Sequence, residues 1–211
     1  MTRKQKIVIL LNVLAVVAQV YASAICIVNR GLWAFQYYTL DSNIFSAITS
    51  ILLIYSLLAK GSVSERLNNF RFYSTCCVTV TFIVVITILV PFNGWHTLPD
   101  KLFRGTDLWL HSVGPWLNII SFLFFESDNT LDKKQPLLSL VPTLIYAVIV
   151  LILNIYRIVD GPYVFLRVHQ NGFIGTVLWL LVVGIMIYGI DLLLKFLNYK
   201  FNYIKRQILI I

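Results

Sequence analysis

Thr39 and His111 are the two side chains whose types could together form a nucleophilic site in this 211-residue chain. A threonine hydroxyl is a weak nucleophile unless a base takes its proton, and a neighbouring histidine is the usual base. Asn43 follows Thr39 by four residues, so the two share a helix face, and the Asn43 amide could donate to a developing oxyanion. Asp107 precedes His111 by four residues, and its carboxylate could hold one imidazole nitrogen and leave the other as the base.

The same residues also have simpler structural explanations. Thr39 belongs to the stretch FQYYTLDSN at the start of a hydrophobic segment, where Asp41 or Ser42 could cap the first helical turn. His111 could be an interfacial histidine bonded to a backbone carbonyl. However, it lies about one turn into a hydrophobic segment, before Gly114-Pro115, which can kink a helix and free carbonyls. Ionisable groups inside a membrane span are costly, which favours a functional explanation for His111.

The segments that must position these residues are hydrophobic and long. The chain is 59% hydrophobic and 12% charged, which is too little charge to cover a soluble domain. Its apolar runs have the length that crosses about 30 Å of hydrocarbon. We therefore predict an all-α integral membrane protein, a single domain over residues 1–211, because the short loops leave no room for a soluble catalytic domain. The six predicted transmembrane helices span about 7–28, 42–59, 72–91, 107–125, 137–157 and 173–197.

Lysine and arginine are unevenly distributed between the two sides of this bundle. The net charge is +8, with 12 basic residues on the side of the termini, Arg71 among them as a loop residue, and 5 on the other side. The positive-inside rule then predicts that both termini are cytoplasmic, where the basic residues contact anionic lipid headgroups. No basic patch is interleaved with aromatics, so we expect no nucleic-acid partner. A bacterial cell membrane fits the chain. Glu126 ends the fourth span at the cytoplasmic interface and needs no special role.

All three histidines and most tryptophans fall on the predicted outer side. Arg167 could bind a substrate carboxylate because a guanidinium matches its geometry, or it could be a plain interfacial charge. His169, Trp33 and Trp116 are further substrate-binding candidates. The tryptophans alternatively form an interfacial aromatic belt.

Two other function classes remain open on the sequence alone. His96, His111 and His169, with Asp107 or Asp160, could bind zinc, although two of the histidines lie in loops without a helix-spaced partner. We expect no metal or other cofactor. A transporter or a non-catalytic membrane protein is the remaining alternative, although no acidic residue is expected at mid-depth and no internal repeat stands out.

Three segments resemble the androgen-induced and androgen-dependent transmembrane threonine hydrolases and their uncharacterised bacterial six-span relatives. They are WAFQYYTLDSNIF, LWLHSVGPWLNIISFLFFE and VDGPYVFLRVHQNG. They occur in the same order as in that family, and the resemblance covers roughly residues 30–175. The resemblance implies a hydrolase of fatty-acid esters of hydroxy fatty acids, with Thr39 as nucleophile and His111 as its base. This chain differs in having Gln-Tyr-Tyr before the threonine, one histidine instead of two, another spacing to Pro115, and Tyr-Val in place of Tyr-Pro.

Residues and resemblance together predict a lipid-ester hydrolase at the outer membrane boundary. The acyl chains of such a substrate could stay among the helices while the ester lies at headgroup depth. A membrane lipid or fatty-acid ester is therefore the expected substrate.

Overall fold

The computed structural model describes residues 1–126 and 131–208, and every regular element in these ranges is helical. The first half holds α1 (Arg3–Arg30), η1 (Gly31–Gln36), α2 (Tyr38–Lys60), α3 (Glu65–Val84), η2 (Val85–Leu89), α4 (Val90–Asn93), η3 (Trp95–Thr97) and α5 (Leu98–Phe103). The second half holds α6 (Gly105–Asp107), η4 (Leu108–Val113), α7 (Gly114–Ser121), η5 (Phe122–Glu126), α8 (Gln135–Leu138), α9 (Leu140–Ile155), η6 (Val164–Leu166) and α10 (Val168–Ile208).

Six helical segments within the described residues are long and apolar enough to cross a membrane, as the sequence predicts. They are Arg3–Gln36, Tyr38–Lys60, Glu65–Asn93, Gly105–Glu126, Gln135–Ile155 and Val168–Ile204. All but the fifth extend beyond the predicted spans at both ends. The polar residues at the ends of the predicted spans are therefore parts of helices.

Local sequence explains several helix ends. Thr2 and Gln5 form a capping box at the start of α1, in which each side chain bonds the backbone N–H of the other residue, at 2.8 and 3.1 Å. Gly61 ends α2 in the left-handed conformation, with φ +65°, which glycine adopts without steric cost. The Ser64 hydroxyl caps α3 by accepting the N–H of Leu67.

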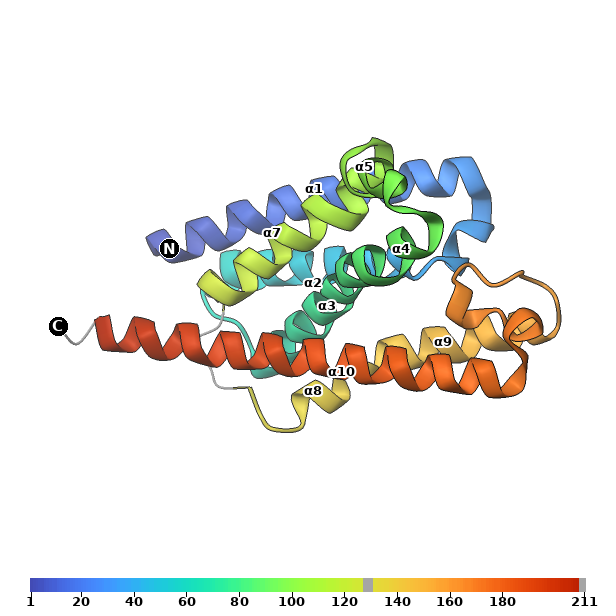
Figure 1. The fold of residues 1–211 in the computed structure, drawn as a ribbon. Helices are drawn as coiled ribbons and strands as arrows, with labels where there is room; N and C mark the ends of the chain where they lie inside the picture. Colours follow the sequence, from blue (N-terminus) through green and yellow to red (C-terminus); the bar gives the residue numbers. More distant parts are fainter. Residues whose placement is uncertain (127–130, 209–211) are drawn as a thin grey trace.

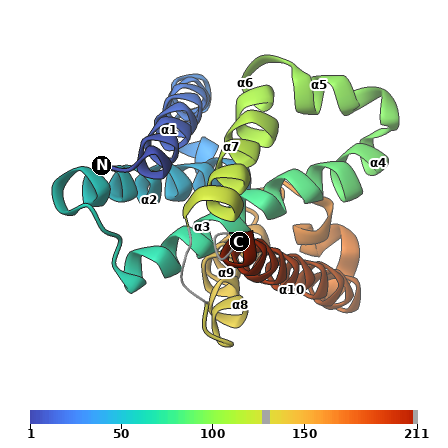
Figure 2. The ribbon, with the colours of Figure 1, turned by 90° about the vertical axis from the view of Figure 1, so that its left-hand side faces the viewer.

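The spanning helices form one bundle in which α3 is central. In both views α1 and α7 lie on one side of α3, and α9 and α10 lie on the other (Figures 1 and 2). The start of α1 and the last turns of α10 lie at the same end of the bundle, and η1 and the segment between α9 and α10 lie at the opposite end (Figure 1). We call this opposite end the Thr39 end, because α2 begins there.

The helices differ in how much of their surface the bundle covers. Within the most apolar stretch of each span, 56% of the residues are buried in Glu65–Asn93, but only 22% in Gln135–Ile155 and in Val168–Ile204. Exposed branched aliphatics such as Ile145, Ile149 and Ile185 cover the outer faces of α9 and α10. These faces suit contact with lipid.

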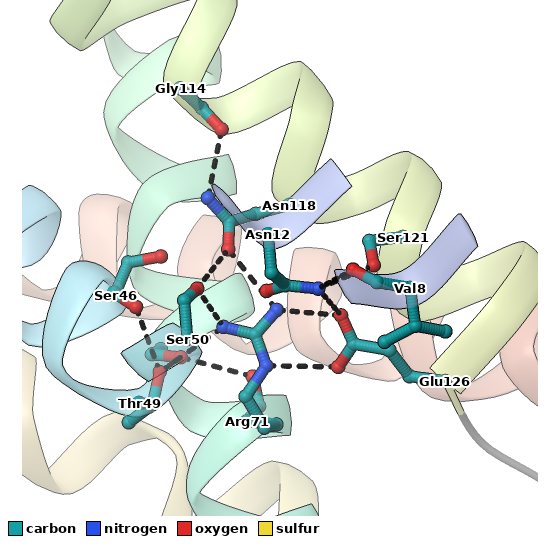
Figure 3. Close-up of polar contacts among 11 residues, drawn as sticks. Val8, Asn12, Ser46, Thr49, Ser50, Arg71, Gly114, Asn118, Ser121 and Glu126 are labelled. Carbon is teal, nitrogen blue, oxygen red and sulfur yellow. Dashed lines mark hydrogen bonds and ion pairs between the residues drawn. The ribbon is translucent and has the colours of Figure 1, made fainter. Parts of the chain in front are cut away.

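A buried ion pair joins the helices near the other end of the bundle (Figure 3). Arg71 on α3 faces Glu126 at the end of η5, with N···O distances of 2.9 and 2.7 Å and side chains only 1% and 2% exposed. The remaining guanidinium N–H groups donate to Thr49, Ser50 and Asn118, so all five are used.

This arrangement corrects two expectations from the sequence. Arg71 is not a loop residue, and Glu126 is not a plain interfacial carboxylate. Asn12 of α1 also donates to Glu126, so the pair connects α1, α2, α3, α7 and η5 (Figure 3). A charge in an apolar interior is tolerated when it is paired and hydrogen-bonded, so this cluster has a structural explanation.

Candidate active site

The side chains of Thr39 and His111 meet at the Thr39 end of the bundle. The distance from Thr39 Oγ1 to His111 Nε2 is 3.2 Å, and the residues are 9% and 6% exposed. Thr39 is the second residue of α2, and His111 belongs to η4, so two spans 72 residues apart in sequence supply the pair. A hydroxyl and an imidazole at this distance have the geometry of a nucleophile and its base.

The backbone of α5 fixes the tautomer of His111. Its Nδ1 lies 2.8 Å from the carbonyl oxygen of Lys101. Because a carbonyl can only accept, Nδ1 carries the hydrogen in the neutral ring and Nε2 is left to accept the Thr39 hydroxyl. Ser112 similarly donates to the carbonyl of Leu102 at 2.8 Å. Both carbonyls belong to the last turn of α5, where they have no partner within the helix.

His111 lies in a π-helical turn. Pro115 has no N–H to donate to the carbonyl of His111 four residues earlier, and the next bond, from Gly114 N–H, reaches the Trp109 carbonyl five residues back. Single π-turns inside α-helices are frequent at functional sites. The predicted kink before Pro115 therefore takes the form of a widened turn that carries the histidine.

Asn43 holds the two halves of the site together. Its Nδ2 donates to the carbonyls of Thr39, at 2.7 Å, and Leu110, at 3.0 Å, while its Oδ1 accepts from Gln19. Both amide hydrogens are therefore used on backbone. The role suggested by this geometry is to position α2 against η4, and not to donate to an oxyanion.

Tyr163 is a residue of this site that sequence reasoning did not single out. Its hydroxyl lies 3.4 Å from the backbone N of Thr39 and 3.5 Å from Thr39 Oγ1. Burial raises the pKa of Tyr163 to about 12, so the hydroxyl keeps its proton across the physiological range. Tyr163 precedes α10 within the segment VDGPYVFLRVHQNG, so its place in that segment was the available signal.

The start of α2 also differs from expectation. The N-cap residue is Tyr37, and no side chain of the first turn caps the helix. Ser42, an expected cap, instead bonds the Thr39 carbonyl and Thr81. The Tyr163 hydroxyl therefore serves as an acceptor for the early N–H of Thr39.

Thr39 lies between two cavities of different character. One cavity, of about 80 Å³, is enclosed by α3, α9, α10 and η6 and is lined mainly by aliphatic side chains. The other, of about 250 Å³, is polar and is lined by Thr39, His111 and Tyr163 together with Asn29, Arg30, Asn93, Lys101 and Asp107. We call these the apolar cavity and the polar cavity. Thr39 and Tyr163 line both.

The expected supporting carboxylates do not bond Thr39 or His111. Asp107 lies 3.5 Å from Lys101 Nζ, and the partner of His111 Nδ1 is a carbonyl instead. Asp41 does not line the polar cavity. It faces a groove of about 750 Å³ between η1, α2 and α9.

The expected substrate-binding residues are dispersed. Arg167 Nε donates to the Gly161 carbonyl at 3.2 Å, and His169 contacts the Asn154 carbonyl at 3.0 Å. Both residues line a surface pocket that does not include Thr39. Trp33 lines the groove that holds Asp41. Trp116 packs edge-on against Phe82 with ring centroids 5.3 Å apart. The structure brings none of these four to Thr39.

The zinc alternative lacks a ligand cluster. Within residues 1–126 and 131–208, no group of three or more His, Cys, Asp and Glu side chains is close enough to hold a metal ion. His96 lies exposed in η3, while His111 is buried beside Thr39.

The chain matches no protein-family profile, and no curated protein or solved structure is significantly similar to it.

Proposed function

We propose that this protein is a membrane hydrolase of lipid esters that uses Thr39 as nucleophile and His111 as general base. The observation that carries the proposal is the 3.2 Å contact between Thr39 Oγ1 and the unprotonated Nε2 of His111, whose Nδ1–H is tied to a carbonyl. The resemblance of three segments to transmembrane threonine hydrolases points to the same two residues.

The proposed reaction passes through an acyl-enzyme. Thr39 Oγ1 attacks the ester carbonyl as its proton moves to His111 Nε2, and the carbonyl oxygen becomes an oxyanion. The Tyr163 hydroxyl and the amino end of α2 lie beside Thr39 and can stabilise that charge. Collapse of the intermediate expels the alcohol, which takes the proton from His111. Water, deprotonated by His111, then releases the acid and restores Thr39.

The two cavities support a lipid ester as the substrate class. A short acyl chain fits the apolar cavity, while the alcohol half of the ester fits the polar cavity, and Thr39 lies where the ester bond would join them. The pair is shielded from bulk water, which favours charge stabilisation by fixed dipoles.

Labelling with a fluorophosphonate tests the assignment. The full chain in detergent micelles should react, with the adduct mapped to Thr39 by peptide mass spectrometry. Thr39→Ala and His111→Ala should lose labelling, whereas Thr39→Ser should retain it. Thr87→Ala and His96→Ala are matched controls, because both residues are exposed and lie outside the polar and apolar cavities. Equal labelling of Thr39→Ala and wild type, with both folded, would refute the proposal.

We further propose a bacterial cell membrane as the location, with both termini cytoplasmic and the Thr39 end outside. Judged from their order along the chain, and leaving out the buried Arg71, eleven of the 17 basic residues lie near the end of the bundle that holds the termini. Five lie near the other end. An impermeant maleimide should react with Asp100→Cys in intact cells and not with Ser62→Cys. The reverse pattern would invert the topology.

A further inference from the structure

One glycine lies in the wall of the apolar cavity. Four residues of α10 line it, Leu180, Val183, Gly184 and Ile187. Their spacing of i, i+3, i+4 and i+7 places them on one helix face. Three are branched aliphatics, so only position 184 leaves this face without a side chain.

Neither backbone conformation nor close packing requires a glycine there. Gly184 does not have a positive φ, and a Cβ built on it meets no heavy atom within 4 Å. By contrast, a Cβ on Gly114 would lie 2.9 Å from the Trp109 carbonyl oxygen. A side chain at position 184 therefore has open space to occupy.

This volume lies on the path that an acyl chain would take. Thr39 and Tyr163 line the cavity where it meets the reactive pair, and α10 runs from the loop of Tyr163 toward the opposite end of the bundle (Figure 1). Gly184 and Ile187 are thus deeper than Leu180. The polar atoms of the wall are occupied, since the Tyr38 hydroxyl contacts Thr143 Oγ1 at 2.6 Å.

We infer that Gly184 sets the length of acyl chain that the site accepts, and that esters of short-chain acids are the preferred substrates. This inference rests on the proposed hydrolase function. A cavity of 80 Å³ holds about three groups of the roughly 30 Å³ that a water or a methylene occupies. With its carbonyl carbon at Thr39, an acyl group of about four carbons therefore fills the cavity. Filling an apolar cavity stabilises the bound state by about 0.8 kcal/mol per buried methylene.

Nitrophenyl esters of acetate, butyrate and hexanoate test the inference on the full chain in detergent. Wild-type kcat/KM should rise from acetate to butyrate and should not rise further for hexanoate. Gly184→Leu places four more carbon atoms at the cavity wall and should lower kcat/KM for butyrate about tenfold or more, with acetate changed about twofold or less. Gly189→Leu is the matched control, because Gly189 lies on the same helix, is exposed and also has open space at its Cβ. An unchanged butyrate-to-acetate ratio in Gly184→Leu would overturn the inference and leave the hydrolase function standing.

Photocrosslinking, which needs no catalysis, distinguishes a failure of the acyl site from a failure of the hydrolase function. Butyric acid with a terminal diazirine should crosslink to residues of the apolar cavity in Thr39→Ala, and the yield should fall with the added Gly184→Leu but not with Gly189→Leu. If Thr39→Ala hydrolyses esters as wild type does, the proposed function fails and crosslinking alone decides whether the cavity binds acyl chains. Equal crosslinking in the Gly184→Leu and Gly189→Leu backgrounds would refute the acyl site.

Discussion

The side-chain amide of Asn43 donates a 3.0 Å hydrogen bond to the carbonyl of Leu110, the residue that precedes His111. The same nitrogen donates to the carbonyl of Thr39, so one amide connects the backbone of Thr39 with that of the residue before His111. Asn43→Leu should remove this donor from the Leu110 carbonyl, while the Thr39 carbonyl keeps the Ser42 hydroxyl as a donor. An unsatisfied buried carbonyl costs about 1–3 kcal/mol of unfolding free energy.

We expect Asn43→Leu to lower both the Tm and fluorophosphonate labelling. Asn69→Leu is the control, because Asn69 lies on α3, is only partly buried and lines neither the polar nor the apolar cavity. Full labelling of Asn43→Leu would show that the amide does not position the site.

Tyr163 should make the protein less stable in alkali. Burial raises the pKa of Tyr163 to about 12, against about 10 for an unperturbed tyrosine. Between these values the unfolded chain loses the proton while the folded chain keeps it, so the unfolding free energy falls as pH rises through this window. The full contribution, present below pH 10, is on the order of 3 kcal/mol.

Thermal unfolding of Tyr163→Phe from pH 8 to 12 checks this expectation. Between pH 10 and 12 the Tm of this variant should fall less than the Tm of wild type. Its fluorophosphonate labelling should be weaker, because the hydroxyl beside Thr39 is gone. Tyr199→Phe, at an exposed position of α10, should follow wild type. Parallel alkaline declines of Tyr163→Phe and wild type would contradict the prediction.

The sequence predicted the spans better than the contacts between them. Apolar length alone defines a membrane helix, and all six were recognised with their order. Helix spacing also placed Thr39 with Asn43 on one face. It could not show that the Nδ1 partner of His111 is the Lys101 carbonyl. Every residue has a backbone carbonyl, so the residue types do not reveal which carbonyl accepts.

The buried ion pair was missed for a related reason. Arg71 and Glu126 are 55 residues apart, and each is close to the end of an apolar run, where a charge usually faces water. Only the packing of α1, α2, α3 and α7 encloses them. The position of Tyr163 against Thr39 likewise depends on the course of a loop, which no periodicity describes.

The Arg71–Glu126 pair should show strong coupling in a double-mutant cycle. Arg71→Met leaves Glu126 buried without a counter-charge, and Glu126→Gln leaves Arg71 buried without one. Each substitution should therefore lower the free energy of unfolding by about 3–5 kcal/mol. The double variant buries no unpaired charge and should be more stable than the sum of the single losses predicts. Thermal unfolding in detergent measures all three.

The exposed pair of Arg104 and Asp100 provides the control for this cycle. Its N···O distance is a similar 2.8 Å, but the side chains are 74% and 62% exposed. Arg104→Met should therefore cost about 1 kcal/mol or less. Additive losses at Arg71 and Glu126 would mean that the two charges do not stabilise each other.

Gly114 should not tolerate a methyl group. A Cβ there would lie 2.9 Å from Gln19 Cγ, 2.9 Å from the Trp109 carbonyl oxygen and 3.0 Å from Asn43 Oδ1. The carbonyl cannot rotate away, so Gly114→Ala should lose about 1–3 kcal/mol and displace the amide of Asn43. Lower Tm and weaker labelling are expected. Gly189→Ala, with open space at its Cβ, should be as stable as wild type or more so.

The separation of Arg71 and Glu126 along the chain also constrains biogenesis. Translation completes α3 before the ribosome reaches Glu126, so the guanidinium enters the membrane region before its counter-ion exists. An arginine without a partner is costly in hydrocarbon, and a long side chain near a helix end can extend to the interface instead. We therefore expect α3 to settle at its final depth only when the span ending at Glu126 arrives. Assembly of the first four spans is then a concerted late step, and truncation before residue 126 should leave α3 susceptible to quality-control proteolysis.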